Sequence, residues 1–577
     1  MATRLAITIA GAVSLGSYEA GVLYELLRAI RTHNQRAEDE SAKIYIDVIT
    51  GASAGGMTAG IVAQRLMYDA EALEGEFGNA LYEAWVENIS LLKLVQLGWK
   101  EKKWHSLFSS DLIDSIGRQM LVDSMKNSGS GPHAAIEQID GVPQPIRVGL
   151  ALTNLNGVDY TIPIVGNPDD GFNYTTSVDQ AAFKATGDKK LFKITDDKNT
   201  RPADWQDMCE AAVGSGAFPA AFRPKAIERG IEDYEAERLP AEKQFRLQGA
   251  TYLDWTGESP KPFAFSDGGV LQNQPLGIAK NLVDAATQER VKSSGAGAYA
   301  ENRMYVFVAP HSVKSSAENL AAGKITILQI LKELAHVYFR QATFHDWIVA
   351  EGVNQRIRSL DTLAAHLAEM ISRELVDVGA LLKAAGDLNV ALMPYDEAER
   401  LARLREQYSA ECQKIMNSGA GPNAVKAFIN ALGTLEATAQ LQDYDKMKIV
   451  AVTANAQTEL AGAGISSFVG FFKKSFREHD YWIGRKKTRT YLQRDDVKAI
   501  LGVKKWPEED SWRTDLPNTS GVEKVPPNFL AVASAALIPG VIAAFIRPAL
   551  LAIVALIIAA GFGLWELLHH GCHLLPH

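Results

Sequence analysis

The residue with the clearest chemical potential is Ser53, the centre of the pentapeptide Gly51-Ala52-Ser53-Ala54-Gly55. This G-x-S-x-G motif stands between a strand-like segment at 44–49 and a helix-like segment at 57–73. A sharp strand-to-helix turn with small flanking residues exposes a serine hydroxyl, which can then attack a carbonyl carbon. The N-terminus of the following helix favours the negative charge that develops in such an attack. The motif and its setting therefore predict a nucleophilic serine.

The same glycines could instead mark a phosphate-binding loop. Gly51 to Thr58 reads GASAGGMT, but Met57 stands where the P-loop motif needs a lysine to reach the phosphates. Gly11 to Gly16 reads GAVSLG after a strand-like segment, and it lacks the middle glycine of the dinucleotide fingerprint. Both patterns argue against nucleotide binding.

A serine hydroxyl is a weak nucleophile at its own pKa, so Ser53 needs a base. The chain has 12 histidines, and a Ser-His-Asp triad is one hypothesis. Its candidate is His311, which follows a strand-like segment at 304–309. A surface or structural role for this histidine is the competing interpretation.

Asp267 is the better candidate for the base. It follows the apolar run Phe263-Ala264-Phe265-Ser266 and precedes Gly268 and Gly269. An acid at the end of a strand, followed by two glycines, is typical of a tight turn that keeps the carboxylate accessible. An ordinary aspartate has a pKa of about 3.9, so we expect burial in an apolar cleft to raise the pKa of Asp267.

The segments around these residues alternate between strand and helix over the first 315 residues. A helix-like segment at 18–31 lies between the first two of four strand-like segments, which are 5–9, 44–49, 147–153 and 304–309. This alternation predicts an α/β fold with a parallel sheet covered on both faces. In such sheets the reactive loops lie at the carboxyl ends of the strands, where Ser53 is expected.

The pattern of apolar residues along the chain changes after residue 315. Helical spacing dominates from 316 to 464, interrupted by the turn-like cluster NSGAGPNA at 417–424. We therefore predict four parts: a catalytic domain at 1–315, a helical extension at 316–464, a basic and aromatic segment at 465–525, and an apolar membrane-anchor hairpin and tail at 526–577.

Composition excludes several classes of protein. The chain of 577 residues is 47% hydrophobic and 22% charged, which excludes disorder or coiled coil for the chain as a whole. A net charge of −9 argues against general nucleic-acid binding, which needs a positive field. Cys209, Cys412 and Cys572 form no CxxC pair and show no zinc-ligand spacing, so we expect a reducing compartment and no metal site.

Part of the basic and aromatic segment carries a local excess of positive charge. Between Phe468 and Arg494, eight basic residues are opposed only by Glu478 and Asp480; they are Lys473, Lys474, Arg477, Arg485, Lys486, Lys487, Arg489 and Arg494. Such a patch before an apolar tail could meet anionic lipid. Alternatively, it is a face that packs on another domain, with its aromatic side chains in the core.

Two uncharged apolar stretches, 529–546 and 549–565, lie near the C-terminus. A membrane-spanning helix needs about 20 apolar residues, with a range of about 17–25, so each stretch is just long enough. Breaks at Pro539-Gly540 and Arg547-Pro548 favour a hairpin of short helices or one span with a re-entrant piece. We predict terminal apolar helices in a membrane, with a buried hairpin in a soluble core as the alternative.

The N-terminal stretch could pass for a secretory signal, but glycines break its apolar run and a helix-like segment follows. Strand, glycine-rich turn and helix is the better interpretation, so we take the mature chain to begin at or near Met1. Together with the predicted anchor, this leads us to expect a membrane-associated protein at the cytoplasmic face.

The motifs together resemble the patatin-like phospholipases, over roughly residues 4–312. The resemblance rests on the Gly11–Gly16 loop, the Ser53 pentapeptide and the Asp267-Gly268-Gly269 turn. Further similar stretches are ALTNLNG at 151–157, AFPAAF at 217–222 and QNQP at 272–275. The stretch FREHDYWIGR at 476–485 is similar to the C-terminal region of a bacterial patatin-related subgroup with a long C-terminal extension.

The resemblance implies a three-layer α/β/α domain with a mainly parallel sheet. It implies a serine lipid acyl hydrolase, similar to phospholipase A or lysophospholipase, that cleaves fatty-acyl esters of phospholipids or other membrane lipids without a cofactor. Ser53 would be the nucleophile and Asp267 the base of a Ser-Asp dyad without histidine. The remaining assignments are Gly11, Ala12, Val13 and Ala54 in the oxyanion hole, and Gly16, Gly51, Gly55, Gly268 and Gly269 as supporting glycines.

The glycine-rich loop departs from the family pattern, which is close to GGGxRG. GAVSLG lacks two of the glycines and the basic residue. The N–H groups of Ala12 and Val13 can still donate, provided that neither position requires a positive φ, which valine tolerates poorly. A catalytically weak or inactive membrane scaffold is therefore one alternative. A soluble esterase or acyltransferase, whose apolar tail is buried core, is another.

Overall fold

The structure is a computed structural model, and the residues that it describes cover most of the chain up to position 513. They are 2–89, 94, 106, 108–127, 129–164, 167–195, 200–219, 221–234, 252–255, 257–294, 302–310, 352, 354–392, 397–439, 448–463, 469–471 and 473–513.

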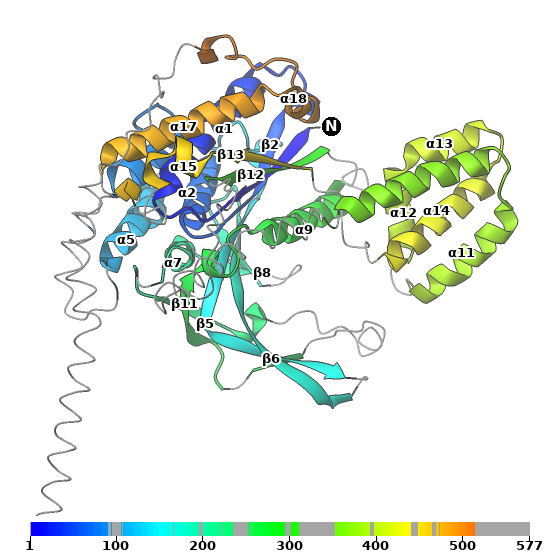
Figure 1. The fold of residues 1–577 in the computed structure, drawn as a ribbon, viewed down its shortest axis with the longest axis horizontal. Helices are drawn as coiled ribbons and strands as arrows, with labels where there is room; N and C mark the ends of the chain where they lie inside the picture. The colour runs from blue at the N-terminus through cyan, green and yellow to red at the C-terminus, as the bar shows by residue number, and fades with distance from the viewer. Residues whose placement is uncertain are drawn as a thin grey trace, which may run out of the picture.

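Parallel strands form the centre of the main sheet, in the order β13, β12, β1, β2 and β5 (Figure 1). Their bounds are Thr3–Ile9 for β1, Ile44–Gly51 for β2, Ile146–Ile164 for β5, Asn302–Ala309 for β12 and Ile449–Thr453 for β13. All residues of β1 and β2 are buried, which explains why apolar residues dominate both strands. The structure confirms the strands predicted at 5–9, 44–49, 147–153 and 304–309, and it adds β13 from beyond residue 315.

Antiparallel strands extend the sheet beyond β5. β6 pairs along β5 and leads on to β7 and β8, while β11 pairs with both β5 and β9, and β10 with β5. These strands are β6 (Asn167–Ala185), β7 (Leu191–Ile194), β8 (Thr200–Ala203), β9 (Lys225–Arg229), β10 (Tyr252–Asp254) and β11 (Lys261–Asp267). Of these strands and β5, the sequence analysis identified only the start of β5 and the apolar run in β11, because the antiparallel strands are rich in polar residues.

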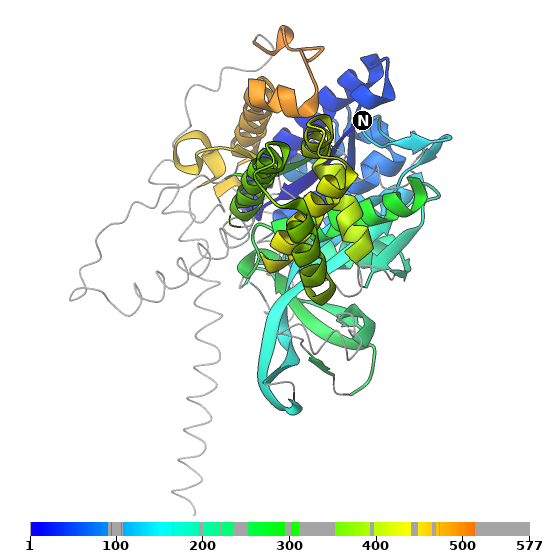
Figure 2. The same cartoon turned by 90° about the vertical axis from the view of Figure 1, so that its right-hand side faces the viewer.

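Helices cover both faces of the sheet, as predicted for a three-layer α/β/α domain. On one face α9 (Leu276–Ser294) packs against β1, β2 and β12. The other face is covered by α1 (Gly16–Arg36), α2 (Ala54–Tyr68), α7 (Trp205–Ser215) and α17 (Lys474–Leu492), which share one large hydrophobic core. Figures 1 and 2 show α17 lying alongside α1, although more than 400 residues separate them in the chain.

The packing of α17 on α1 accounts for Arg485 and Arg489, two of the eight basic residues of this segment. Arg485 and Arg489 donate from their Nε atoms to the two carboxylate oxygens of Glu25, both at 2.8 Å, and all three side chains are buried. A Cβ on Gly484 would lie 2.2 Å from the carbonyl oxygen of Tyr18, so the two helices approach closely at a glycine. For these two arginines the structure favours the domain-packing interpretation over a lipid-binding patch.

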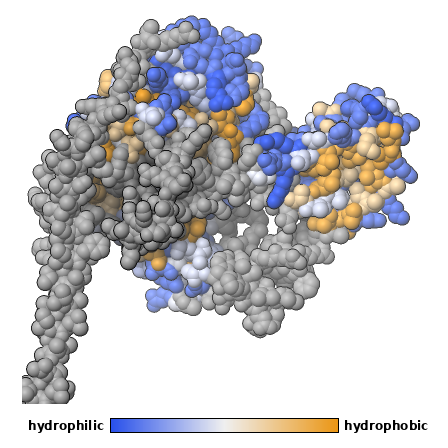
Figure 3. Space-filling view, viewed as in Figure 1, coloured by the Kyte–Doolittle hydropathy of each residue, from blue (hydrophilic) through white to orange (hydrophobic). Residues whose placement is uncertain are grey.

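A separate helical unit follows the sheet domain and has its own hydrophobic core. It comprises a helical stretch at 354–372, α11 (Val378–Leu392), α12 (Glu397–Gln407), α13 (Ser409–Asn417) and α14 (Pro422–Thr438). The turn predicted at 417–424 joins α13 to α14. Figure 2 places this unit toward the viewer, and Figure 3 shows apolar side chains on its surface.

The two apolar stretches at 529–546 and 549–565 lie outside the described residues. Within the described ranges, no helix is both long enough and apolar enough to cross a membrane. The terminal apolar helices and the four predicted part boundaries stay predictions. The boundaries must accommodate β13 and α17, because both pack onto the N-terminal domain.

Candidate active site

Ser53 lies at the turn between β2 and α2, where the sequence analysis placed the nucleophile. Its φ of 56° and ψ of −127° are rare for a residue other than glycine, and such strain costs about 1–3 kcal/mol. The flanking glycines permit the tight turn: a Cβ on Gly51 would lie 2.1 Å from the carbonyl oxygen of Gly55, and a Cβ on Gly55 would lie 2.5 Å from that of Ile9. This turn, which we call the elbow, therefore requires both motif glycines.

Asp267 receives a hydrogen bond from this serine. Ser53 Oγ lies 2.5 Å from Asp267 Oδ2. This hydrogen bond joins the predicted nucleophile and the predicted base, which are 214 positions apart in the chain. Ser53 is 6% exposed and Asp267 is 1% exposed. The structure thus brings the predicted pair into hydrogen-bonding contact in a nearly dry environment. His311, the candidate for a triad, lies outside the described residues.

The end of β11 holds Asp267 in place. The peptide N–H of Asp267 donates to the carbonyl of Ala217 at 3.0 Å, and Thr153 Oγ1 donates to the carbonyl of Asp267 at 2.8 Å. Its second carboxylate oxygen, Oδ1, accepts the N–H of Gly269 at 2.7 Å. Backbone and side-chain contacts together fix the direction in which the carboxylate points.

Burial raises the pKa of Asp267 to about 7, because the low-dielectric surroundings penalise the carboxylate. The hydrogen bonds from Ser53 and Gly269 oppose this shift without cancelling it. The expectation that an apolar cleft raises the pKa of this group agrees with the direction found. A pKa near neutrality suits a general base.

Ser215, at the end of α7, supports the elbow and was not predicted. The N–H of Ser53 donates to Ser215 Oγ at 3.0 Å, and Ser215 Oγ donates to the carbonyl of Ala151 at 2.7 Å. The hydroxyl thereby links the nucleophile's backbone to β5. The signal in the sequence was its position just before the AFPAAF stretch at 217–222, which carried part of the resemblance.

The Gly11 loop lies directly beside the nucleophile. A Cβ on Gly11 would lie 3.1 Å from the Cβ of Ser53 and 2.1 Å from Oδ1 of Asn273. The N–H of Gly11 donates to the carbonyl of Asn273 at 3.0 Å, so this donor is already engaged. The other supporting glycines also have neighbouring atoms in the space that a Cβ would fill; they are Gly16, Gly268 and Gly269.

Val13 adopts a positive φ of 53°, the conformation that its side chain tolerates poorly. For an L-residue the left-handed region costs roughly 1–2 kcal/mol. The loop thus has a backbone conformation suited to glycine at a position that a β-branched residue occupies.

This strain predicts an inverted order of stability for two substitutions at Val13. We expect the free energy of unfolding of Val13→Gly to be about 1 kcal/mol higher than that of Val13→Ala, because glycine has no Cβ to clash with the carbonyl oxygen. In ordinary backbone the order is the reverse, with glycine less stable by roughly 0.5–1 kcal/mol. Urea denaturation of both variants measures the difference, and a more stable Val13→Ala would contradict the strain.

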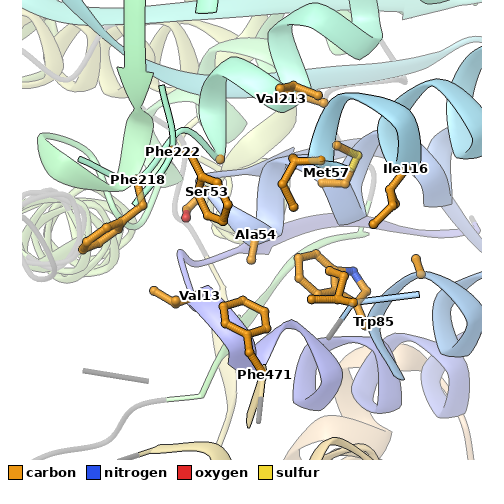
Figure 4. Close-up of a pocket in the computed structure, with 15 residues that line it drawn as sticks. Val13, Ser53, Ala54, Met57, Trp85, Ile116, Val213, Phe218, Phe222 and Phe471 are labelled. Carbon is orange, nitrogen blue, oxygen red and sulfur yellow. The ribbon is translucent and has the colours of Figure 1, made fainter. Parts of the chain in front are cut away.

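An apolar pocket opens beside Ser53. Figure 4 shows Ser53 at its edge with Phe218 and Phe222 nearby. Apart from Ser53, the lining consists of apolar residues and a glycine: Val13, Ala54, Met57, Ala84, Trp85, Ile89, Ile113, Ile116, Ala212, Val213, Gly216, Phe218, Phe222 and Phe471. Such a lining suits a hydrocarbon chain.

Part of this chain, including the site, is similar to known proteins. An uncharacterized protein from Sinorhizobium fredii is 25% identical over 327 residues, which cover 47% of this chain and 44% of that protein. An uncharacterized membrane protein from Mycobacterium tuberculosis is 23% identical over 338 residues, covering 54% of this chain and 27% of that protein. The matches thus span less than half the length of either relative. The family model described as patatin-like phospholipase matches residues 7–280, which include both Ser53 and Asp267, and this part of the chain belongs to the patatin-like phospholipase family.

Proposed function

We propose that this protein is a serine lipid acyl hydrolase that cleaves fatty-acyl esters through a Ser53–Asp267 dyad. The observation that carries the proposal is the 2.5 Å hydrogen bond between Ser53 Oγ and Asp267 Oδ2 at the edge of an apolar pocket. Membership of residues 7–280 in the patatin-like phospholipase family supports the same class of reaction. The substrates would be phospholipids, lysophospholipids or other acyl esters.

The reaction would proceed in two halves. The Asp267 carboxylate takes the proton of Ser53 Oγ while this oxygen attacks the ester carbonyl carbon, and the protonated Asp267 then passes that proton to the departing alcohol. In the second half, Asp267 takes a proton from a water molecule that attacks the acyl-enzyme. The fatty acid leaves and the proton returns to Ser53.

The negative charge on the carbonyl oxygen needs hydrogen-bond donors near Ser53. The N–H of Gly11 donates to Asn273, so we assign the oxyanion donors to Ala12, Val13 and Ala54, with Gly11 providing the close approach. Ala54 is the first residue of α2, where the N–H groups have no partner one turn earlier in the helix. The positive end of the helix dipole adds to the same effect.

Membrane lipid as the source of the ester is part of the proposal. The apolar lining of the pocket supports it, and one relative carries the description of a membrane protein. Attachment through the C-terminal apolar stretches, and a position at the cytoplasmic face, stay predictions. Carbonate extraction of the membrane fraction measures attachment directly.

The pKa of Asp267 predicts the pH profile of hydrolysis. Asp267 must be ionised to accept the serine proton, so kcat/KM should rise with pH through about 7 and reach a plateau above it. Initial rates on p-nitrophenyl octanoate between pH 5 and 9, in buffers of constant ionic strength, give the profile. A profile that is flat from pH 5 upward would contradict Asp267 as the base.

Turnover tests the proposed function itself. The purified full chain should release nitrophenolate from p-nitrophenyl esters and fatty acid from phospholipid vesicles, and a fluorophosphonate should label it on serine. Absence of both turnover and labelling would instead support the catalytically inactive scaffold. Transfer of the acyl group to an added alcohol, in preference to water, would favour an acyltransferase.

A further inference from the structure

One wall of the apolar pocket comes from outside the family-matched part of the chain. The family model ends at residue 280, whereas Phe471 lines the pocket from the short 3-10 helix Val469–Phe471. Figure 4 shows the ring of Phe471 on the side of the pocket that faces away from Val213, near Val13 and Trp85. On the basis of the proposed function, we propose that Phe471 determines acyl-chain specificity and that Arg477 is its positioning residue.

Arg477 ties this short helix to another wall of the pocket. Its Nη1 donates to the carbonyl of Gly470 at 2.9 Å and to that of Phe471 at 3.4 Å. Its Nε and Nη2 donate to the carbonyl of Val86 at 3.0 and 2.9 Å. Val86 follows Trp85, another residue of the pocket lining. One guanidinium thus fixes the distance between two walls.

The guanidinium of Arg477 is buried in this position. Burial lowers the pKa of Arg477 to about 10, yet the group stays charged at neutral pH. A buried cation is costly unless it is hydrogen-bonded, and the peptide carbonyls provide that compensation. Removing the side chain would leave the carbonyls of Val86 and Gly470 without this donor, so both segments would be free to move.

The same short helix also contacts the Gly11–Gly16 loop. The N–H of Gly470 donates to Ser14 Oγ at 3.1 Å, and a Cβ on Gly470 would lie 2.6 Å from that oxygen. Ser14 follows Val13, which lines the pocket beside Ser53. The wall that carries Phe471 is therefore anchored next to the reacting serine, where a change in the acyl chain's position affects hydrolysis.

The size of residue 471 should set how much chain the pocket accepts. Phe471→Ala removes a ring from the wall, so longer acyl chains gain contact area, whereas Phe471→Trp leaves less room. One methylene in a hydrophobic pocket changes specificity by about tenfold or more. We therefore expect Phe471→Ala to raise the ratio of kcat/KM for palmitate over octanoate esters about tenfold, and Phe471→Trp to lower it.

The experiment measures kcat/KM of the full chain on p-nitrophenyl butyrate, octanoate and palmitate. Arg477→Met should shift the profile in the same direction as Phe471→Ala, because the wall is no longer held. The double variant should match Phe471→Ala alone, since Arg477 acts through Phe471. Arg485→Met is the matched control: it is another buried arginine of α17, but it pairs with Glu25 and Glu76.

The outcomes separate this inference from the proposed function. A wild-type chain that hydrolyses none of the esters contradicts the proposed function. An active chain whose Phe471→Ala and Phe471→Trp variants keep the wild-type profile overturns the specificity role. Equal shifts with Arg477→Met and Arg485→Met overturn the positioning role, because a loss of stability in α17 would then account for both. Circular dichroism verifies that each variant is folded.

Discussion

Ser53→Ala is expected to lower kcat for ester hydrolysis by a factor of about 10⁴ to 10⁶ and to eliminate fluorophosphonate labelling. Without Oγ the acyl-enzyme cannot form, and only the oxyanion donors and the apolar pocket remain to assist attack by water. Asp267 keeps its hydrogen bond from Gly269 in this variant, so the turn at the end of β11 has no reason to move. Rates on p-nitrophenyl octanoate and gel fluorescence of the labelled chain measure the two effects.

A matched serine variant shows whether such a loss is specific. Ser124 is half-buried and donates to Gln64 and to the carbonyl of Met120, and it is outside the pocket lining. Ser124→Ala should keep both turnover and labelling. Labelling of Ser53→Ala at full strength would mean that another residue is the nucleophile, and the dyad would have to be abandoned.

The central fold was predictable because its signals are local and apolar. β1 and β2 are buried on both faces, so apolar residues dominate each of them. The elbow around Ser53 was predictable for a different reason, because small residues are required at Gly51 and Gly55 by contacts within the turn itself. Both kinds of signal can be recognised without knowing the tertiary structure.

The parts that sequence analysis missed depend on contacts between distant segments. Ser215 supports Ser53 across 162 positions, and Arg477 reaches Val86 across 391. A serine that bridges two backbones has no characteristic spacing in the chain. The basic residues on α17 were noticed, but charge alone cannot distinguish a lipid-facing patch from arginines buried against Glu25. Tertiary packing decides between those interpretations.

The cost of valine at position 13 depends on its backbone φ, which the sequence does not give. The sequence showed that valine replaces a glycine of the family pattern, with consequences only if the backbone there has a positive φ. The observed φ of 53° meets that condition, so this valine bears the cost of a left-handed backbone conformation. The close approach of Gly11 to Ser53 explains why the loop cannot relax freely, since it lies against the elbow.

Asp267→Asn is expected to lower kcat by about 10⁴, because an amide cannot accept the proton of Ser53. The variant keeps the shape of the side chain and an oxygen that can accept the N–H of Gly269. Fluorophosphonate labelling should slow along with turnover, since both reactions need an activated Ser53. Unchanged turnover in Asp267→Asn would assign the base to another group and would revive the histidine hypothesis.

The same substitution is expected to stabilise the fold at alkaline pH. The pKa of Asp267 is about 7 in the folded protein and about 3.9 in an unfolded chain, so the folded state binds more protons between these values. Stability contributed by this group is therefore lost as pH rises from about 4 to 7. Asparagine does not titrate, so the advantage of Asp267→Asn should be absent near pH 4 and reach on the order of 4 kcal/mol at pH 8.

Urea denaturation of wild type and Asp267→Asn at pH 5 and pH 8 measures this difference. Asp480 is also buried, with a pKa raised to about 7, but it is present in both proteins, so its contribution cancels in the comparison. A variant less stable than wild type at pH 8 would show that the buried carboxylate is net stabilising. The predicted combination, lost activity with increased stability, follows because a carboxylate that is costly to ionise in its apolar site is also basic enough to take a serine proton.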